Sequence, residues 1–218
     1  MTNFIQAIAI DPFAIRDIAP LLLDPKNELK VVPASILENT TREERCLFGV
    51  RHAVYGFLTE ELIAFLQDII GTKTAIEIGS GYGGLAKALN IPATDNRMQE
   101  DREIKAFYAA LGQPVITYGR HVEKLNALEA LNKYKPKVVI ASWVTHRYNP
   151  DRSEAGGNQF GVTEEDIISA CDAYVFIGNE SVHAKKSIWA LPHEKITPPW
   201  LYSRAGNGSA DFIAIWRK

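Results

Sequence analysis

The chain has 218 residues, of which 46% are hydrophobic, so it can form one well-buried domain and is hardly long enough for two. Its 24 basic and 26 acidic residues give a formal net charge of −2, which excludes a general attraction to nucleic acid or to an anionic membrane. Two cysteines, Cys46 and Cys171, cannot make a disulfide framework or a metal cluster without other ligands. We therefore predict no metal site.

The first ten residues lack the basic start and the apolar core of a signal peptide. No apolar run approaches the ~20 residues that are needed to span a bilayer. These features predict a cytoplasmic protein that does not act at a membrane.

The first third of the chain predicts helices and loops without a clear strand. Asp11 and Pro12 suit the cap and the first turn of a helix that ends before Pro20. A second helix is predicted from about Arg42 to Tyr55. A third helix is predicted to begin after Thr59 and to end at Gly71. We expect residues 1–70 to be a helical extension that packs on a core domain formed by residues 71–218.

The most informative stretch is residues 73–86, in which a short apolar run meets a glycine-rich segment. Thr74 to Ile78 is rich in β-branched residues and predicts a strand, whereas Leu85 to Leu89 predicts a helix. The glycines between them are Gly79, Gly81, Gly83 and Gly84. Such a turn lets the backbone approach a ligand and presents the unpaired N–H groups of a helix N-terminus. The pattern therefore predicts a site for a nucleotide-type cofactor.

Different cofactors are compatible with this turn. Residues 79–84 match the dinucleotide pattern G-x-G-x-x-G, which is a weak signal when it stands alone. Glu77 lies two residues before the first glycine, where an acid would repel a pyrophosphate. A cofactor that carries an ammonium and a sulfonium would instead be attracted by this carboxylate. A tight strand–helix turn that binds no ligand is a further alternative.

The segment Glu77-Ile78-Gly79-Ser80-Gly81-Tyr82-Gly83 resembles the E/D-x-G-x-G-x-G signature of class I S-adenosylmethionine-dependent methyltransferases. The resemblance implies that S-adenosylmethionine is the cofactor and that Glu77 receives its ammonium group, directly or through water. The cofactor-binding residues that it implies in this turn are Glu77, Gly79, Ser80, Gly81 and Tyr82. As architecture the resemblance extends over about residues 60–218, but only residues 75–95 form a specific motif.

A second acid follows the next predicted strand, Ile91 to Asp95. Asp95 lies 18 residues after Glu77, and in βαβ nucleotide folds an acid about 20 residues on accepts hydrogen bonds from the ribose hydroxyls. Asp95 does not distinguish between the cofactors, and aspartate also favours turns and helix caps. We expect Asp95→Ala to weaken cofactor binding at least about tenfold and to leave the thermal unfolding of the ligand-free protein nearly unchanged.

The remaining chain alternates strands and helices, which predicts an α/β fold with a doubly wound, mostly parallel sheet. Further strands are predicted at Val115–Tyr118, Lys137–Ser142, Ala173–Ile177, Glu194–Thr197 and Asp211–Trp216. Helices are predicted over about residues 99–111, 122–131, 163–170 and 182–189. The resemblance to methyltransferases implies a seven-stranded sheet whose last strand inserts antiparallel beside the fifth.

The chemistry is expected at the carboxyl end of the fourth strand, which is the usual crevice of an open α/β sheet. Ser142 and Trp143 are expected to lie there beside the cofactor. His146 is the predicted general base because its unperturbed pKa is near neutrality, although a structural role is equally open. Residues 142–151 lack the Asn-Pro-Pro-Tyr type motif of enzymes that methylate base amino groups, so no DNA substrate is expected.

These patterns together predict a methyltransferase that acts on an oxygen or nitrogen atom of a small molecule. An NAD(P)-dependent oxidoreductase is one alternative. A methyltransferase-like binding protein without catalysis is another, because no recognisable catalytic motif follows the fourth strand. The sequence predicts neither the substrate nor the oligomeric state.

Overall fold

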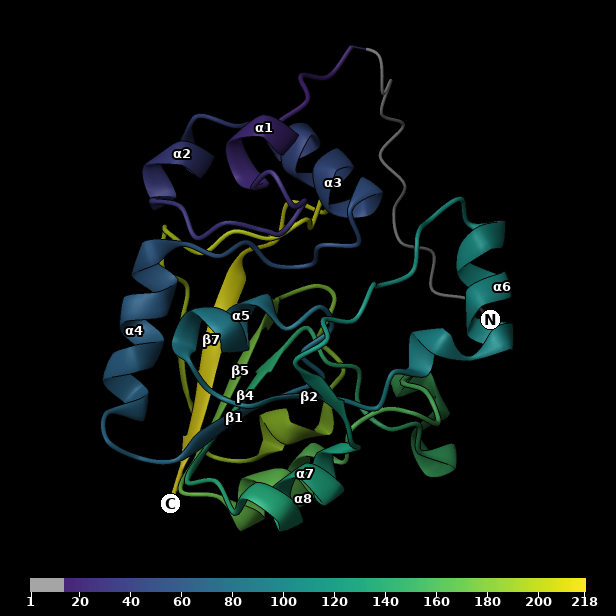
Figure 1. Cartoon of the computed structure of the whole chain (residues 1–218). Helices are drawn as coiled ribbons and strands as arrows, with labels where there is room; N and C mark the ends of the chain where they lie inside the picture. Colours follow the sequence, from purple (N-terminus) through teal and green to yellow (C-terminus); the bar gives the residue numbers. More distant parts are fainter. Residues whose placement is uncertain (1–13) are drawn as a thin grey trace.

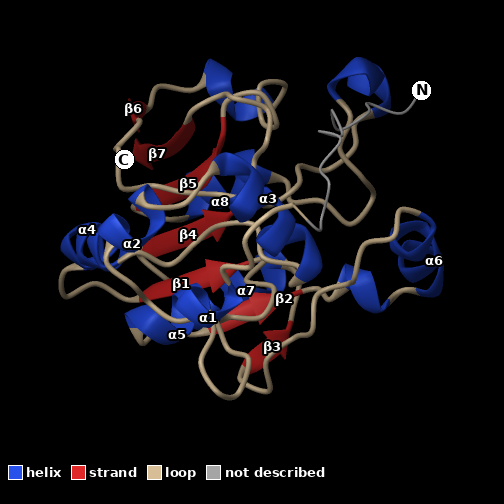
Figure 2. Ribbon diagram, turned by 90° about the horizontal axis from the view of Figure 1, so that it is seen from above, coloured by secondary structure: helices blue, strands red, loops and turns tan. Residues whose placement is uncertain are grey.

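The computed structural model describes residues 14–218 and has a seven-stranded sheet at its centre (Figures 1 and 2). The strands are β1 (Ala75–Ile78), β2 (Ala93–Asp95), β3 (Val122–Lys124), β4 (Val138–Ser142), β5 (Ala173–Asn179), β6 (Glu194–Ile196) and β7 (Asp211–Arg217). The α-helices are α1 (Ala19–Leu22), α2 (Ala34–Glu38), α3 (Arg42–Arg51), α4 (Glu60–Ile70), α5 (Gly84–Leu89), α6 (Arg102–Ala110), α7 (Ala127–Tyr134) and α8 (Glu164–Ala170). Short 3-10 helices occur at η1 (Met98–Glu100), η2 (Pro150–Ala155) and η3 (Ser187–Ala190).

The strand order is β3-β2-β1-β4-β5-β7-β6, and the first five strands in this order pair in parallel. β7 lies antiparallel between β5 and β6. This arrangement confirms the predicted α/β fold with a doubly wound, mostly parallel sheet and an antiparallel last strand. The pairing of β5 with β7 extends from Ala173 opposite Arg217 to Asn179 opposite Asp211.

Each face of the sheet is covered by its own apolar core, because successive strand residues point to opposite faces. On one face, Leu66 of α4 packs in a cluster that contains Ile140 of β4. On the other face, Val139 of β4 packs in a cluster that contains Ala130 of α7 and Ile167 of α8. In Figure 1, α7 and α8 lie below the strands and α4 stands beside them. The sheet is therefore buried on both faces, and ligands can reach it only at its ends.

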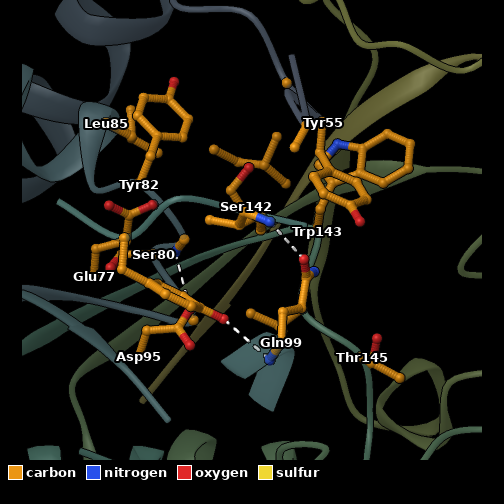
Figure 3. Close-up of a pocket in the computed structure, with 18 of the residues that line it drawn as sticks. Tyr55, Glu77, Ser80, Tyr82, Leu85, Asp95, Gln99, Ser142, Trp143 and Thr145 are labelled. Carbon is orange, nitrogen blue, oxygen red and sulfur yellow. Dashed lines mark hydrogen bonds between the residues drawn. The ribbon is translucent and has the colours of Figure 1, made fainter. Parts of the chain in front are cut away.

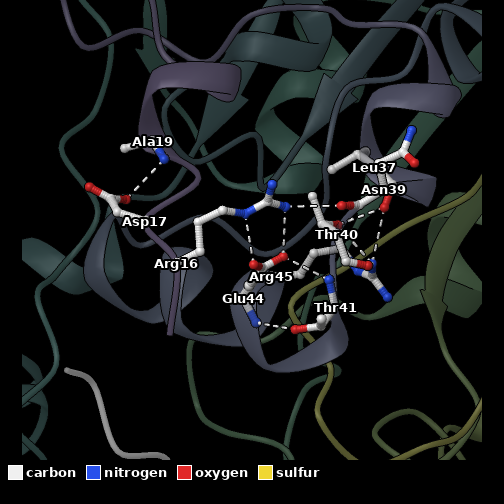
Figure 4. Close-up of polar contacts among 9 residues, drawn as sticks. All are labelled: Arg16, Asp17, Ala19, Leu37, Asn39, Thr40, Thr41, Glu44 and Arg45. Carbon is white, nitrogen blue, oxygen red and sulfur yellow. Dashed lines mark hydrogen bonds and ion pairs between the residues drawn. The ribbon is translucent and has the colours of Figure 1, made fainter. Parts of the chain in front are cut away.

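The helices that precede α4 form a separate apolar cluster, and polar contacts fix their arrangement (Figure 4). The Arg16 guanidinium pairs with the Glu44 carboxylate at 2.8 Å. Glu44 also accepts a hydrogen bond from the backbone N–H of Thr41, which caps α3. Arg45 donates to the backbone carbonyl of Thr40 at 2.7 Å. These contacts hold the α1–α3 region in one arrangement above the sheet.

The predicted ends of α4 are confirmed. The Thr59 hydroxyl accepts a hydrogen bond from the backbone N–H of Leu62 at 3.1 Å, and Gly71 follows the last helical residue. The helix predicted between Asp11 and Pro20 is wrong in its described part, because residues 14–18 are not helical and Pro20 lies in the first turn of α1. Its start at Asp11 lies outside the described residues.

The prediction of the third strand is wrong. Residues 115–118 are irregular. The backbone N–H of Ile116 donates to the Gln99 side-chain oxygen at 2.7 Å and so is not available to pair with a strand. The strand is instead Val122–Lys124, where a helix is predicted, and Val122 pairs with Ala93 of β2. The helix predicted at residues 182–189 is also wrong, since residues 181–185 form turns before η3. In this segment the Lys186 side chain is buried and pairs with Glu164.

Within residues 14–218, every helix is too short or too polar to cross a membrane.

Candidate functional site

A cavity lies at the carboxyl ends of β1, β2, β4 and β5, where open α/β sheets typically bind their ligands. Its walls include the turn after β1, the ends of β2 and β4, and parts of the segments 53–62 and 96–118. Together with the solvent in its open mouth, the cavity measures about 1210 Å³. The cavity is open to solvent, so a ligand bound in it can extend beyond its mouth.

The cavity brings together all the residues that the sequence predicts to bind a cofactor. These are Glu77, Gly79, Ser80, Gly81, Tyr82, Asp95, Ser142 and Trp143. In Figure 3, Glu77 and Asp95 lie on one side of Ser142, whereas Trp143 and Tyr55 lie on the other side. The carboxylates are therefore confined to one half of the cavity.

The glycines after β1 are required by the fold itself. Gly79, Gly81 and Gly83 have φ values of 58°, 57° and 80°, in the left-handed region that favours glycine. A Cβ on Gly79 would lie 2.5 Å from a methyl carbon of Val144, and one on Gly83 would lie 2.5 Å from the His121 ring. The turn thus comes close to neighbouring side chains on one side and to the cavity on the other.

Glu77 is buried at the end of β1, with 2% of its surface exposed. One of its carboxylate oxygens accepts a hydrogen bond from the backbone N–H of Ala86, in the first turn of α5, at 2.9 Å. Burial, together with the nearby Asp95, outweighs this hydrogen bond and raises the pKa of Glu77 to about 8. A positively charged ligand group at this carboxyl would favour its ionised form.

Asp95 ends β2 and joins the backbone of two segments. One carboxylate oxygen accepts a hydrogen bond from the backbone N–H of Gly81 at 2.9 Å, and the other accepts from the backbone N–H of Arg97 at 2.6 Å. Burial raises the pKa of Asp95, while these two hydrogen bonds oppose the rise. Asp95 therefore stabilises the glycine turn without any ligand, which argues against the expectation that Asp95→Ala leaves the stability of the ligand-free protein nearly unchanged. A carboxylate has further lone pairs that can accept from ligand hydroxyls.

The Ser80 hydroxyl is a polar group without a partner. It is buried, and no hydrogen bond reaches it from any described residue. A buried hydroxyl that is left unpaired costs about 1–3 kcal/mol. Because Ser80 lines the cavity between the two carboxylates, a ligand with a polar group could satisfy it.

Trp143 follows β4 with a backbone conformation that is rare for an aromatic residue. Its φ is 59°, in the left-handed region, and its backbone N–H donates to the backbone carbonyl of Ile177 at 2.9 Å. The indole packs on the edge of the His183 ring, with centroids 5.2 Å apart, and against Tyr55 at 5.9 Å. Strained backbone of this kind is concentrated at ligand sites, and here it sets the position of the indole in the cavity wall.

Comparisons with known proteins add the following. No family model matches the chain, and no curated protein matches it. Among solved structures, a precorrin-6y C5,15-methyltransferase from Geobacter metallireducens is 15% identical, with 73% of this chain and 89% of that chain covered and a TM-score of 0.38. The mitomycin 7-O-methyltransferase MmcR is 14% identical, with 68% of this chain and 50% of that chain covered and a TM-score of 0.35. A Thermoplasma acidophilum protein is 16% identical, with 80% and 89% covered and a TM-score of 0.36.

These TM-scores are all below 0.5. The fold is therefore defined by the strand order of the sheet, in which β7 inserts antiparallel beside β5. This strand order is the one implied by the resemblance of residues 77–83 to class I methyltransferases.

His146 is not among the described residues that line the cavity. Its ring lies beneath Gly157, on which a Cβ would approach the His146 Nε2 to 3.1 Å. This Nε2 atom is buried and has no hydrogen-bond partner among the described residues. Burial, followed by the charge of Lys186, lowers the pKa of His146. The structure thus separates the predicted general base from the residues predicted to hold the cofactor.

Sequence reasoning missed a polar chain in the cavity wall. The hydroxyls of Tyr55 and Tyr108 lie 3.2 Å apart, and the Gln99 amide donates to the Tyr108 hydroxyl at 3.4 Å. Tyr55 precedes α4, whereas Tyr108 belongs to α6, and no periodic pattern links two tyrosines so far apart in sequence. Elsewhere, residues 14–218 contain no group of three or more His, Cys, Asp or Glu side chains that could hold a metal ion.

Proposed function

We propose that this protein is an S-adenosylmethionine-dependent methyltransferase that acts on an oxygen or nitrogen atom of a small molecule. The observation that carries the proposal is the pair of buried carboxyls, Glu77 and Asp95, beside a glycine turn in one cavity. This half of the cavity suits a ligand that carries one cationic group and several hydroxyls.

The ammonium group and the ribose hydroxyls of the cofactor each have a matching group in this chain. The ammonium group would lie at Glu77, where its charge offsets the cost of ionising a buried carboxyl. The ribose hydroxyls would donate to the remaining lone pairs of Asp95. The orphan Ser80 hydroxyl would gain a partner from the cofactor. When bound, S-adenosylmethionine supplies an electrophilic methyl group on a sulfonium.

The contribution of the protein to the reaction is mainly orientation. Ser142 and Trp143, at the end of β4, would lie where the cofactor meets the substrate and would hold the two in line. Since His146 lies outside the cavity lining, we propose that transfer does not depend on His146 as a base.

The cofactor is tested by calorimetric titration with S-adenosylmethionine, S-adenosylhomocysteine, NAD and NADP in parallel. We expect S-adenosylhomocysteine to bind and neither dinucleotide to do so, because an ammonium group favours the ionised Glu77 carboxylate, whereas a pyrophosphate offers this carboxyl no opposite charge. A clear NAD or NADP isotherm together with a silent S-adenosylhomocysteine titration would overturn the proposal in favour of an oxidoreductase.

The placement of His146 also favours a second candidate, a methyltransferase-like protein that binds the cofactor without catalysis. Incubation with methyl-labelled S-adenosylmethionine and a broad mixture of small molecules distinguishes the two. Labelled product that forms equally in the wild type and in His146→Ala supports the enzyme. Tight cofactor binding without any labelled product supports the binding protein.

A further inference from the structure

The described residues that line the half of the cavity beyond Ser142 are uncharged. Among the described residues that line the cavity, only Glu77 and Asp95 are charged, and both lie in the half assigned to the cofactor. The other half includes the aromatic side chains of Trp143 and Tyr55 together with apolar residues. The Arg204 guanidinium packs on the Tyr55 ring but does not line the cavity, so a charged substrate would lose its hydration here without direct contact with a partner of opposite charge.

In this half, Gln99, Tyr108 and Tyr55 form a chain of hydrogen bonds, and the orientation of the Gln99 amide fixes which atom donates at one end of the chain. The Gln99 side-chain oxygen accepts from the backbone N–H of Ile116 at 2.7 Å, so the Gln99 amide nitrogen must face Tyr108. This nitrogen donates to the Tyr108 oxygen. The two tyrosine hydroxyls carry two hydrogens, and the hydrogen bond between them uses only one of these hydrogens.

One O–H group of the pair is left over, whichever tyrosine donates to the other. Both tyrosines line the cavity, so the spare hydrogen is available to a molecule inside it. Burial, which is the largest effect, raises the pKa of Tyr108 above its ordinary value, so this hydroxyl keeps its hydrogen near neutral pH. The Arg204 guanidinium lies 3.6 Å from the centroid of the Tyr55 ring and holds this ring in place.

We propose that the Tyr55–Tyr108 pair selects the substrate, which is an uncharged planar ring that carries a hydrogen-bond-accepting oxygen such as a carbonyl. The ring lies against the indole of Trp143, and the spare tyrosine O–H donates to its oxygen. This inference rests on the proposed function, because it assigns the other half of the cavity to S-adenosylmethionine.

The test uses three probes of similar size on the protein saturated with S-adenosylhomocysteine. Acetophenone has a carbonyl, ethylbenzene lacks it, and benzoate carries a negative charge. Their affinities are measured by ligand-observed NMR titration. We expect acetophenone to bind about fivefold more tightly than ethylbenzene, as one net hydrogen bond provides. Benzoate is expected to bind most weakly.

Variants locate the hydrogen bond. Tyr55→Phe and Tyr108→Phe each leave one hydroxyl with a free hydrogen, so each single variant should keep part of the preference for acetophenone. The double variant Tyr55→Phe/Tyr108→Phe should lose it. Tyr118→Phe is the matched control, since Tyr118 also lines the cavity but its hydroxyl contacts the Gln99 backbone instead of the pair.

The outcomes separate this inference from the proposed function. If the wild type does not bind S-adenosylhomocysteine, the proposed function itself fails. If S-adenosylhomocysteine binds but benzoate binds as well as acetophenone, the inference is overturned. It is also overturned if the preference for acetophenone survives in the double variant or is lost in Tyr118→Phe. An unchanged affinity of the double variant for S-adenosylhomocysteine shows that its fold is intact.

Discussion

At the scale of one residue, the buried carboxyl of Glu77 has opposite effects on folding and on cofactor binding. Its ionised form destabilises the ligand-free protein but would bind the ammonium group of the cofactor. Its pKa of about 8 lies above the ordinary value of 4.5, so the folded state retains a proton that the unfolded chain loses. The folded state is therefore favoured below the ordinary pKa, and this advantage is lost as the pH rises toward 8. The carboxyl is nevertheless the group that would attract the ammonium of the cofactor.

We expect Glu77→Gln to stabilise the ligand-free protein at pH 8 and to impair cofactor binding. Glutamine can still accept the Ala86 N–H through its oxygen but has no charge to bury. The gain should be roughly 2–4 kcal/mol at pH 8 and should nearly vanish at pH 4.5, since one pKa unit corresponds to about 1.4 kcal/mol. Chemical denaturation across this pH range measures the effect. Affinity for S-adenosylhomocysteine should fall at least about tenfold.

The opposite pattern would contradict this account of Glu77. A variant that loses stability at pH 8 would mean that the ionised carboxylate stabilises the ligand-free fold. Unchanged affinity for S-adenosylhomocysteine would place its ammonium group elsewhere in the cavity.

Asp95 tests the difference between a structural and a ligand-binding carboxylate. Asp95→Ala leaves the backbone N–H groups of Gly81 and Arg97 without their acceptor, so we expect the ligand-free protein to lose about 2–4 kcal/mol of unfolding free energy. Asp95→Asn keeps one acceptor oxygen and should lose less. Thermal unfolding with and without S-adenosylhomocysteine separates the two roles. Equal stabilisation of the wild type and Asp95→Asn by the ligand would remove Asp95 from ribose binding.

The residues of the site were predictable to the extent that their roles follow from local pattern. Glu77, the glycine turn and Asp95 belong to one strand–turn–helix–strand unit, so their spacing in sequence already fixes their proximity. The position of His146 depends on the path of the loop after β4, which folds back so that Val162 bridges to His146. Tyr55 and Tyr108 meet only through tertiary packing, which no short-range pattern encodes.

At the scale of elements, the sequence correctly predicts the helices whose first and last residues are typical helix-capping residues. The α4 helix has a threonine cap and a closing glycine, and both act as predicted. The third strand was misplaced because β3 is short and lies at the sheet edge, so its apolar signal is weak. The segment at residues 182–189 has apolar residues at helical spacing, but its turns are fixed by polar contacts, including a hydrogen bond from the His183 N–H to the Asn179 carbonyl.

The turn that joins β1 to α5 offers a test at this scale with a matched control. Gly83 and Gly112 both have positive φ values, of 80° and 64°. A Cβ on Gly83 would lie within 2.6 Å of both His121 and Val122, whereas one on Gly112 would meet no atom within 4 Å. Gly112→Ala should therefore cost only the conformational strain, about 1 kcal/mol. Gly83→Ala should cost at least about 2 kcal/mol more, because overpacking adds to that strain.

Denaturant titrations of the two glycine variants measure this difference directly. Equal losses would show that the neighbours of Gly83 move aside freely, and that only its backbone conformation requires glycine.

At the scale of the whole molecule, a buried ion pair joins segments that are distant in sequence. Lys186 and Glu164 pair with 1% of each side chain exposed, and the Tyr174 hydroxyl donates to the same carboxylate at 2.7 Å. This group connects the start of α8 and the start of β5 with the segment before η3. Its arrangement is closed to solvent, so it contributes to the fold and not to the cavity.

We expect Lys186→Met to destabilise the protein by about 3–5 kcal/mol, because it leaves the Glu164 carboxylate buried without its cation. The double variant Lys186→Met/Glu164→Gln should recover much of this loss, since glutamine is neutral and can still accept from Tyr174. Urea denaturation of Lys186→Met, Glu164→Gln and the double variant measures the three unfolding free energies that a double-mutant cycle needs. Additive losses would show that the two charges do not depend on each other.

The position of β7 between β5 and β6 has a consequence for synthesis. The chain makes β5 about 30 residues before β7, yet β6 has no contact with the sheet except through β7. While the ribosome is still adding residues 180–210, β5 therefore presents an unpaired and almost wholly apolar edge to the cell. The growing chain is most open to aggregation or chaperone binding in this interval, and the arrival of residues 211–217 ends it by completing the sheet from its middle.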